Sequence, residues 1–413
     1  MRKLLCTSLV LLLILSGVTA AFAAEANKDT TAAASTEAAA PKTTGAAVTT
    51  DSDSETTGAA VTIIPDMTFT GDPIKLSLDA AYKKMEADSP QAEVADLNRQ
   101  IDLGISKGYS EKVSLINKSK EAGGDYSTTD KNILSIQKEY AATQAAKNFE
   151  AEMNQLKSDT MKNYYTLKEL ENQVQIAKDN LALKEKLLSN TQLKFKLGTV
   201  AKSDLLQAEI SVNEAKDQLL AAQNGLSTTK MGFNQFMGYG LMQNVTLTDA
   251  IKEVAMPKKS LSDTIKDALK SRNEIHEAEY QVKVSTLNLN NYNAYPRSSS
   301  KYIDAKMSLL LAETNKKNAP LTVESDVRTK YMAVNEKYSA VQTGKKSVEN
   351  AQESERLAQL QYDAGMATLS DVEGAQLAYY NAQLSYSKTL LEYNLAVYDY
   401  ELAGTVGTKS AKI

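Results

Sequence analysis

The sequence contains one long segment twice, with a constant shift of 167 residues between the copies. Its most recognisable stretch reads Phe195-Lys-Leu-Gly198-Thr-Val-Ala-Lys-Ser203-Asp204 in the first copy and Tyr362-Asp-Ala-Gly365-Met-Ala-Thr-Leu-Ser370-Asp371 in the second. The register holds without a gap in both directions, from Ser158 on Ser325 to Ala215 on Ala382. Such a duplication indicates a repeated structural unit whose copies pack on one another. We therefore expect the function to lie in the assembly of these units rather than in a catalytic pocket.

The residue pattern within each copy predicts a long helical hairpin. The chain has no Trp and only seven Pro, all of which we expect outside the two hairpins, and no Pro occurs between residues 91 and 256, so long uninterrupted helices are permitted there. After each turn, apolar residues recur at alternating spacings of three and four, which is the heptad pattern of a coiled coil. We therefore predict an all-α fold of two tandem antiparallel coiled-coil hairpins, with arms of about 60 Å and a first ascending helix beginning as early as Asp130. The return-arm seams are Leu205, Ala208, Val212, Ala215, Leu219, Ala222 and Leu226 in the first copy, and Val372, Ala375, Tyr379, Ala382, Tyr386, Thr389, Tyr393, Ala396 and Tyr400 in the second.

The turn between the two arms carries a matching set of residues in both copies. The glycine can end the ascending helix in the left-handed conformation, and the serine can cap the return helix. The aspartate then lies in the first turn, where the helix dipole favours a negative charge, and Ser370 and Glu373 have the spacing of a capping box. These residues either serve only to make the turn or, repeated around an oligomer, form the acidic mouth of a pore. They are Gly198, Ser203 and Asp204 in the first copy and Gly365, Ser370 and Asp371 in the second.

The composition along the chain predicts its domain organisation. Residues 1–23 have the basic start, apolar run and small-residue cleavage site of a secretory signal peptide, with an uncleaved membrane anchor as the alternative. Residues 24–73 are rich in Ala, Thr and Ser, a composition typical of a disordered linker. The first hairpin repeat then occupies 74–250, the second 251–407, and a short tail 408–413. Each repeat opens with a shorter helix, which starts after Ser77 in the first and after Ser260 in the second.

The chemistry available to the chain argues against an enzyme. Its only cysteine, Cys6, lies in the signal segment, and its only histidine, His276, has no counterpart in the first repeat. No phosphate-binding loop, metal-ligand spacing or nucleophile motif occurs. The formal net charge is −4, and the sequence shows no basic stripe for nucleic acid. We therefore expect no cofactor, no metal and no nucleic-acid partner.

The chain resembles the TolC family of outer membrane efflux proteins over residues 76–407. The resemblance is carried by a secretory signal, by coiled-coil arms, and by a turn of the form Phe/Tyr-x-x-Gly-x-x-x-x-Ser-Asp that occurs twice between the arms. The resemblance implies a homotrimer in which three chains close an α-barrel tunnel of twelve helices. It further implies that the six turn residues form the pore mouth and contact a periplasmic adaptor (membrane fusion) protein beside an inner-membrane pump. Such a conduit would pass small molecules or polypeptides in an efflux or type I secretion system. The implied location is extracytoplasmic, at the outer membrane.

One part of the family pattern does not match. Family members insert two strands between the opening helix and the long helix of each repeat, and these strands together build a membrane β-barrel. The first connector, residues 104–131, carries several lysines and shows no sustained alternation of polarity. The second, residues 289–322, is expected to form a loop and a short helix, so we expect little or no β-barrel. The alternative function is a non-conducting extracytoplasmic coiled-coil protein with a structural or adaptor role in the envelope.

Overall fold

The structure of the chain is a computed structural model, which describes residues 68–124 and 127–409. The predicted signal peptide, almost all of the predicted linker and most of the tail lie outside the described residues. Contacts divide the chain into Met1–Thr62 and Ile63–Ile413, and every described residue belongs to the second unit. No helix in the described ranges combines the length and the apolar composition needed to cross a membrane. The elements follow in the order β1 (Thr70–Leu76), α1 (Leu78–Asp88), α2 (Pro90–Glu121), α3 (Thr128–Lys196), α4 (Lys202–Phe236), β2 (Gln243–Leu247), α5 (Leu261–Ser271), α6 (Asn273–Asn291), α7 (Ser300–Asp363) and α8 (Leu369–Ala403).

The two short opening helices begin as the sequence predicts. The Ser77 hydroxyl accepts a hydrogen bond from the backbone N–H of Ala80 at 3.2 Å and caps α1, and the Ser260 hydroxyl caps α5 through the N–H of Asp263 at 3.1 Å. Ser77 and Ser260 are 183 residues apart, and so are Pro90 and Asn273, where α2 and α6 begin. The opening helix and its successor therefore repeat with one constant offset.

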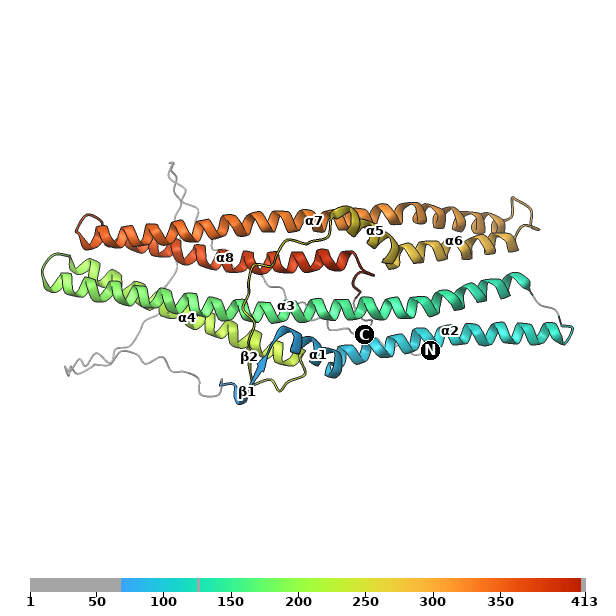
Figure 1. Ribbon diagram of the computed structural model, residues 1–413, viewed down its shortest axis with the longest axis horizontal. Helices are drawn as coiled ribbons and strands as arrows, with labels where there is room; N and C mark the ends of the chain where they lie inside the picture. Colours follow the sequence, from blue (N-terminus) through green and yellow to red (C-terminus); the bar gives the residue numbers. More distant parts are fainter. Residues whose placement is uncertain (1–67, 125–126, 410–413) are drawn as a thin grey trace, which may run out of the picture. The chain divides into compact units, whose positions relative to one another are not determined.

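Two long helices run the length of the helical body and carry the shorter helices. α3 has 69 residues and α7 has 64, so each is about 100 Å long at 1.5 Å per residue. In the half that ends in the predicted turns, the helices lie side by side in the order α4, α3, α8, α7, and in the opposite half the order is α2, α3, α6, α7 (Figure 1). α3 therefore has helices on both sides along its whole length, whereas α7 lies at the edge of the row of helices in both halves.

The predicted heptad seams are the packing surfaces of the hairpins. Ala208, Val212 and Ala215 of α4 are buried, and so is Leu167 of α3. On α8 the tyrosine positions pack in pairs against α7. The rings of Tyr393 and Tyr338 lie 5.6 Å apart and those of Tyr400 and Tyr331 lie 5.5 Å apart. Tyr393 and Tyr400 of the α8 seam are thus core packing, at the offset-ring distances that aromatic pairs prefer.

Both connectors are largely helical, and the second differs from the expectation of a loop and a short helix. α2 continues to Glu121 and α3 starts at Thr128, so most of the first connector is helical, and in the second one α7 starts at Ser300 and includes Pro320. The lysines of the first connector fit a solvated helix face. Proline removes one backbone donor, but the carbonyl that loses its partner belongs to exposed Lys316, where water can replace it. The prediction that all prolines lie outside the hairpin arms is wrong at this position.

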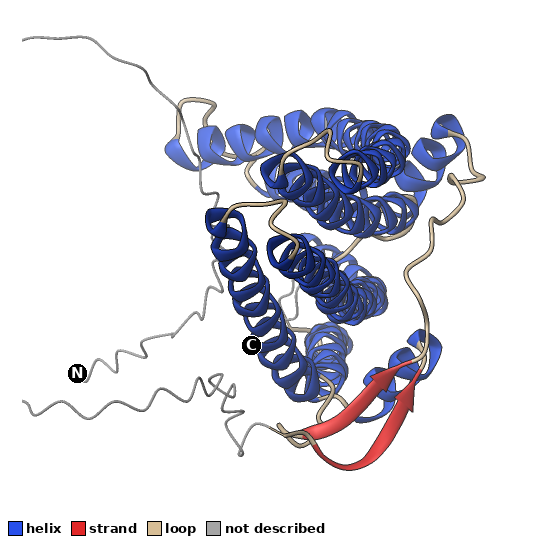
Figure 2. Cartoon of the chain, turned by 90° about the vertical axis from the view of Figure 1, so that its left-hand side faces the viewer, coloured by secondary structure: helices blue, strands red, loops and turns tan. Residues whose placement is uncertain are grey.

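A two-stranded parallel sheet, which the sequence did not predict, joins the start of the body to the end of the first hairpin. β1 pairs with β2 in parallel, and the strands lie at one edge of the helical body (Figure 2). Leu76 and Leu247 are buried against Tyr164 of α3, whose hydroxyl donates to the Leu76 carbonyl at 2.9 Å. β1 starts at Thr70, within the stretch assigned to the linker, so the folded body begins a few residues before the predicted boundary at 73.

Candidate functional site: the hairpin tips

Both predicted turns form, and both use glycine in the left-handed conformation. Gly198 has φ +72° and Gly365 has φ +77°. In the first turn the N–H of Thr199 donates to the carbonyl of Lys194 at 3.0 Å, and the N–H of Gly198 donates to the carbonyl of Phe195 at 2.9 Å. This is the Schellman pattern of a helix end, and the second turn repeats it.

The caps of the return helices lie two residues earlier than predicted. α4 is capped by Ala201 and α8 by Thr368, whereas Ser203 and Ser370 lie inside the first helical turn. The predicted serine caps and the predicted Ser370–Glu373 capping box are therefore wrong. The chain leaves its extended conformation at the earlier residue because the aspartate three positions later can reach back to the N–H of that residue.

The two aspartates make unequal caps. Asp371 accepts hydrogen bonds from the N–H of Thr368 at 2.8 Å and from its hydroxyl at 2.7 Å, and its own N–H donates to that hydroxyl at 3.3 Å. These bonds lower the pKa of the Asp371 carboxyl, with the Thr368 hydroxyl as the largest cause. Asp204 accepts from the N–H of Ala201 at 3.4 Å and receives no matching bond from the side chain, because alanine has no side-chain oxygen. The second copy thus has a complete capping box and the first copy has half of one.

The two tips pack against each other through a small apolar core to which all four tip helices contribute. Tyr362 of α7 is its largest member and is only 4% exposed. Phe195, which occupies the matching position in the first copy, is 38% exposed. The two copies therefore use the same turn in different environments, one against its neighbour in the chain and the other at a free surface. The buried members of the core are Leu187, Ala208, Tyr362, Leu369 and Val372.

Lys194 of the first tip holds Tyr362 of the second tip in place. Its ammonium group lies 3.6 Å from the centre of the tyrosine ring, donates to the Tyr362 carbonyl and lies 4.0 Å from a carboxylate oxygen of Asp363. The Thr191 hydroxyl donates to the Leu187 carbonyl at 2.9 Å, so the Tyr362 hydroxyl is the donor in its 3.1 Å bond to Thr191. A cation–π contact and one hydrogen bond from its hydroxyl therefore fix the Tyr362 side chain between the tips, and the Lys194 bond to the carbonyl holds its backbone.

A second set of polar contacts joins the hairpins one turn above the tips. Glu373 of α8 accepts hydrogen bonds from Gln207 at 3.3 Å and from the Ser211 hydroxyl, both on α4. Lys184 of α3 is buried nearby, and burial lowers its pKa against the opposing effect of Glu373 and two further glutamates. These groups can hold the hairpins in register.

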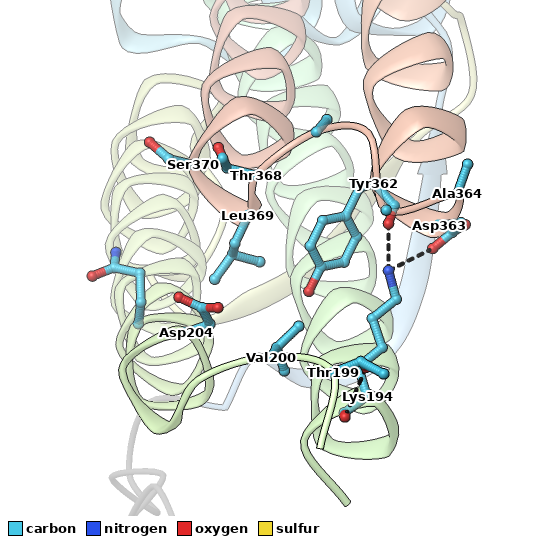
Figure 3. A pocket seen from close by; sticks show the side chains of 13 residues that line it. Lys194, Thr199, Val200, Asp204, Tyr362, Asp363, Ala364, Thr368, Leu369 and Ser370 are labelled. Atoms are coloured by element: carbon cyan, nitrogen blue, oxygen red, sulfur yellow. Dashed lines mark hydrogen bonds and ion pairs between the residues drawn. The ribbon is translucent and has the colours of Figure 1, made fainter. Parts of the chain in front are cut away.

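A cavity of about 560 Å³ lies between the two tips (Figure 3). Three of the six predicted tip residues line it, namely Asp204, Gly365 and Ser370, while Gly198, Ser203 and Asp371 do not. Two functional contacts were not predicted from the sequence: Lys194, which also lines the cavity, and Glu373, which joins the hairpins. Both stand at positions where the copies differ in chemical class, because Lys194 matches Gln361 and Glu373 matches Leu206. Their signal in the sequence is thus a difference between the copies, not an identity.

Comparison with known proteins identifies the fold. No protein family model and no curated protein sequence matches the chain. Among solved structures, the chain is similar to the outer membrane protein VceC from Vibrio cholerae, with a TM-score of 0.62 and 12% identity over 80% of this chain and 96% of that one. It is also similar to the MtrE outer membrane channel of Neisseria gonorrhoeae, with a TM-score of 0.58 and 14% identity over 81% of this chain and 91% of that one. The predicted TolC-like fold of two tandem helical hairpins is thereby confirmed.

Proposed function

We propose that the chain is the exported conduit component of an efflux or type I secretion system and acts as a homotrimer. Three chains with two hairpins each would close a tunnel of twelve helices, which passes small molecules or polypeptides across the cell envelope. The similarity of the fold to outer-membrane channels supports this role. The proposed location is extracytoplasmic, with the far end of the conduit directed to the outer membrane.

The observation that carries the proposal is the unequal exposure of matching residues at the two tips. The hairpins lie side by side with their tips at the same end, and Tyr362 is buried between them while its counterpart Phe195 is not. The second hairpin buries this face against the first hairpin, whereas the first hairpin leaves the matching face exposed. This is expected if the exposed face contacts the second hairpin of another copy. Repetition of one lateral contact with closure produces a ring.

We propose that the tips form the mouth of the tunnel and the contact surface for a periplasmic adaptor beside an inner-membrane pump. Each chain brings two carboxylates, Asp204 and Asp371, to this end, and a ring of carboxylates favours passage of cations. The remaining tip residues, Gly198, Ser203, Gly365 and Ser370, shape the turns that present these charges.

Ion selectivity in a planar lipid bilayer tests this role. The double variant Asp204→Asn and Asp371→Asn removes both charges but keeps side-chain oxygens that accept the cap hydrogen bonds. We expect the wild-type chain to conduct with a preference for cations and the variant to lose most of that preference. Asp217→Asn, at an exposed position of α4 away from the tip, is the matched control and should leave selectivity unchanged. A wild-type chain that assembles but does not conduct would favour the non-conducting structural or adaptor role instead.

A further inference from the structure

The end of the helical body opposite the tips is formed by the two places where the chain reverses between a shorter and a longer helix. α2 ends and α3 begins there, and so do α6 and α7 (Figure 1). The rings of Tyr140 on α3 and Tyr280 on α6 stack at 3.7 Å across the body just before this end. We call the residues beyond this stack, 107–139 and 281–307, the connector end.

The connector end is basic, whereas the rest of the chain is acidic. Its two ranges hold ten lysine and arginine residues and six aspartate and glutamate residues, which gives a formal net charge of +4. The whole chain carries −4, so the remainder carries −8. A charge of one sign gathered at one end produces a field that attracts partners of the opposite sign.

The cations of the connector end are left without carboxylate partners. Lys120 apart, none of them forms an ion pair within the part of the chain that the structure describes, whereas such pairs are frequent elsewhere, as between Lys157 and Glu86 and between Lys337 and Glu392. Eight of these nine cations are exposed, so their charges are available to anions outside the chain. The nine are Lys107, Lys112, Lys118, Lys131, Lys138, Lys283, Arg297, Lys301 and Lys306.

The turn between α6 and α7 combines these cations with tyrosines. The rings of Tyr292 and Tyr295 meet edge to face at 5.4 Å, and the ammonium group of Lys301 lies 5.4 Å from the centre of the Tyr295 ring. The guanidinium group of Arg297 lies 4.4 Å from the centre of the Tyr302 ring and donates a hydrogen bond to its hydroxyl. Tyr302 is buried and holds the arginine in place, while Tyr295 is 41% exposed. The turn therefore presents an aromatic ring and fixed positive charges on one surface.

This chemistry fits the headgroup layer of an anionic membrane. Lysine and arginine near a membrane surface are attracted to anionic lipids, and tyrosine favours the boundary between headgroups and hydrocarbon. Nine of the ten cations at the connector end are lysine, a point charge on a flexible stem that can follow mobile headgroups. Recognition of a phosphate in one fixed geometry favours the planar fork of arginine instead. The residue types thus favour lipid over a polymer with fixed charges.

We propose that the connector end docks on a membrane surface by binding anionic lipid headgroups, with Arg297, Lys301, Lys306 and Tyr295 at the centre of the contact. The inference deepens the proposed function and rests on it for the direction of this end toward a membrane. In the proposed trimer, six connectors face the same plane, and their individually weak attractions add to a stable contact.

Vesicle flotation of the purified chain tests the charge requirement. Vesicles consist of phosphatidylcholine alone or of an equimolar mixture with phosphatidylglycerol. We expect the wild-type chain to float with the anionic vesicles, to dissociate from them as the salt concentration rises, and to stay unbound on phosphatidylcholine. The triple variant Arg297→Gln, Lys301→Gln and Lys306→Gln is expected to bind the anionic vesicles at least about a hundredfold more weakly, at about fivefold per cation.

Two matched variants separate local charge from net charge and from side-chain shape. Lys216→Gln with Lys345→Gln and Lys346→Gln removes three charges from exposed positions in the tip half, none of which forms an ion pair with a described residue. This variant should bind like the wild-type chain. A variant that exchanges lysine and arginine at the three test positions keeps their charge and should also bind like the wild-type chain. Loss of binding in either control would overturn the inference.

Tryptophan fluorescence locates the contact. The chain has no tryptophan, so Tyr295→Trp introduces a single reporter at the connector end. Phe195→Trp introduces the control at a tip, where the native side chain is 38% exposed against 41% for Tyr295. Anionic vesicles should shift the emission of the first reporter to the blue and leave that of the second unchanged. A shift at the tip alone would refute the assigned surface.

The mass of the assembly separates this inference from the proposed function. A wild-type trimer that floats with neither kind of vesicle would refute the docking and leave the conduit standing, whereas a monomer that floats with the anionic vesicles would refute the trimer and support the docking. Equal flotation with both kinds would show that charge does not direct the contact and would overturn the inference. Binding of soluble polyphosphate without flotation would identify an anionic polymer as the partner and would likewise overturn it.

Discussion

Replacing Gly365 by alanine isolates the backbone requirement of the second tip. The residue has φ +77°, and a Cβ added there would meet no other atom within 4 Å. A steric clash therefore cannot contribute, and the change acts only through the left-handed conformation, which costs an L-residue about 1–2 kcal/mol. Gly374 lies nearby inside α8, where an added Cβ also meets nothing within 4 Å. Alanine there is expected to stabilise the helix by about 1 kcal/mol.

Native-state hydrogen exchange on peptides spanning residues 360–380 measures both effects. Gly365→Ala is expected to speed exchange at the tip by about five- to thirtyfold, since every 1.4 kcal/mol corresponds to a factor of ten. Gly374→Ala is expected to slow it by about fivefold. The first copy carries Gln207 at the position that matches Gly374, so the repeat does not require glycine there. Equal effects of the same sign from both variants would refute the account of the turn.

Two further predictions concern buried groups. Tyr362→Ala is expected to lower the free energy of tip opening by about 3–5 kcal/mol because a buried aromatic ring is lost. Phe195→Ala in the dissociated chain is expected to change this free energy by less than about 1 kcal/mol. Hydrogen exchange measures both, and comparable losses of opening free energy in the two variants would contradict the difference in burial. Burial raises the pKa of the Glu169 carboxyl in the folded chain, and hydrogen bonds from Gln173 and Ser387 oppose this shift. The carboxyl therefore favours folding at a pH below its unfolded pKa of about 4. It loses that contribution to the free energy of unfolding as the pH rises through the folded pKa. Glu169→Gln is therefore expected to raise the urea midpoint at pH 7 and to change it little below about pH 4, and a larger gain in acid than at pH 7 would reverse the assigned sign.

The parts of the fold that the sequence predicted depend on local rules that both copies obey. The glycine turns, the heptad seams and the short opening helices after Ser77 and Ser260 each follow from residues close in sequence. The internal duplication strengthened them, because a pattern found twice at one offset is a stronger signal than the same pattern found once.

The parts that were missed depend on contacts between distant residues. The continuation of α2 through Gly104 and Gly108 is supported by packing on α3, where the Ser106 hydroxyl donates to the Lys138 carbonyl at 3.0 Å. Pro320 lies inside α7 against its local preference. β1 and β2 are short and far apart in the chain, so neither gave a recognisable signal alone. At the tips, the contacts between the hairpins involve lysine and glutamate residues that the repeat does not share.

The mass of the native assembly, measured by native mass spectrometry on the purified chain, tests the central proposal most directly. A conduit built from lateral contacts between hairpins predicts a closed assembly of three chains. A stable monomer or a simple dimer would contradict it, because neither can close a tunnel from two hairpins per chain.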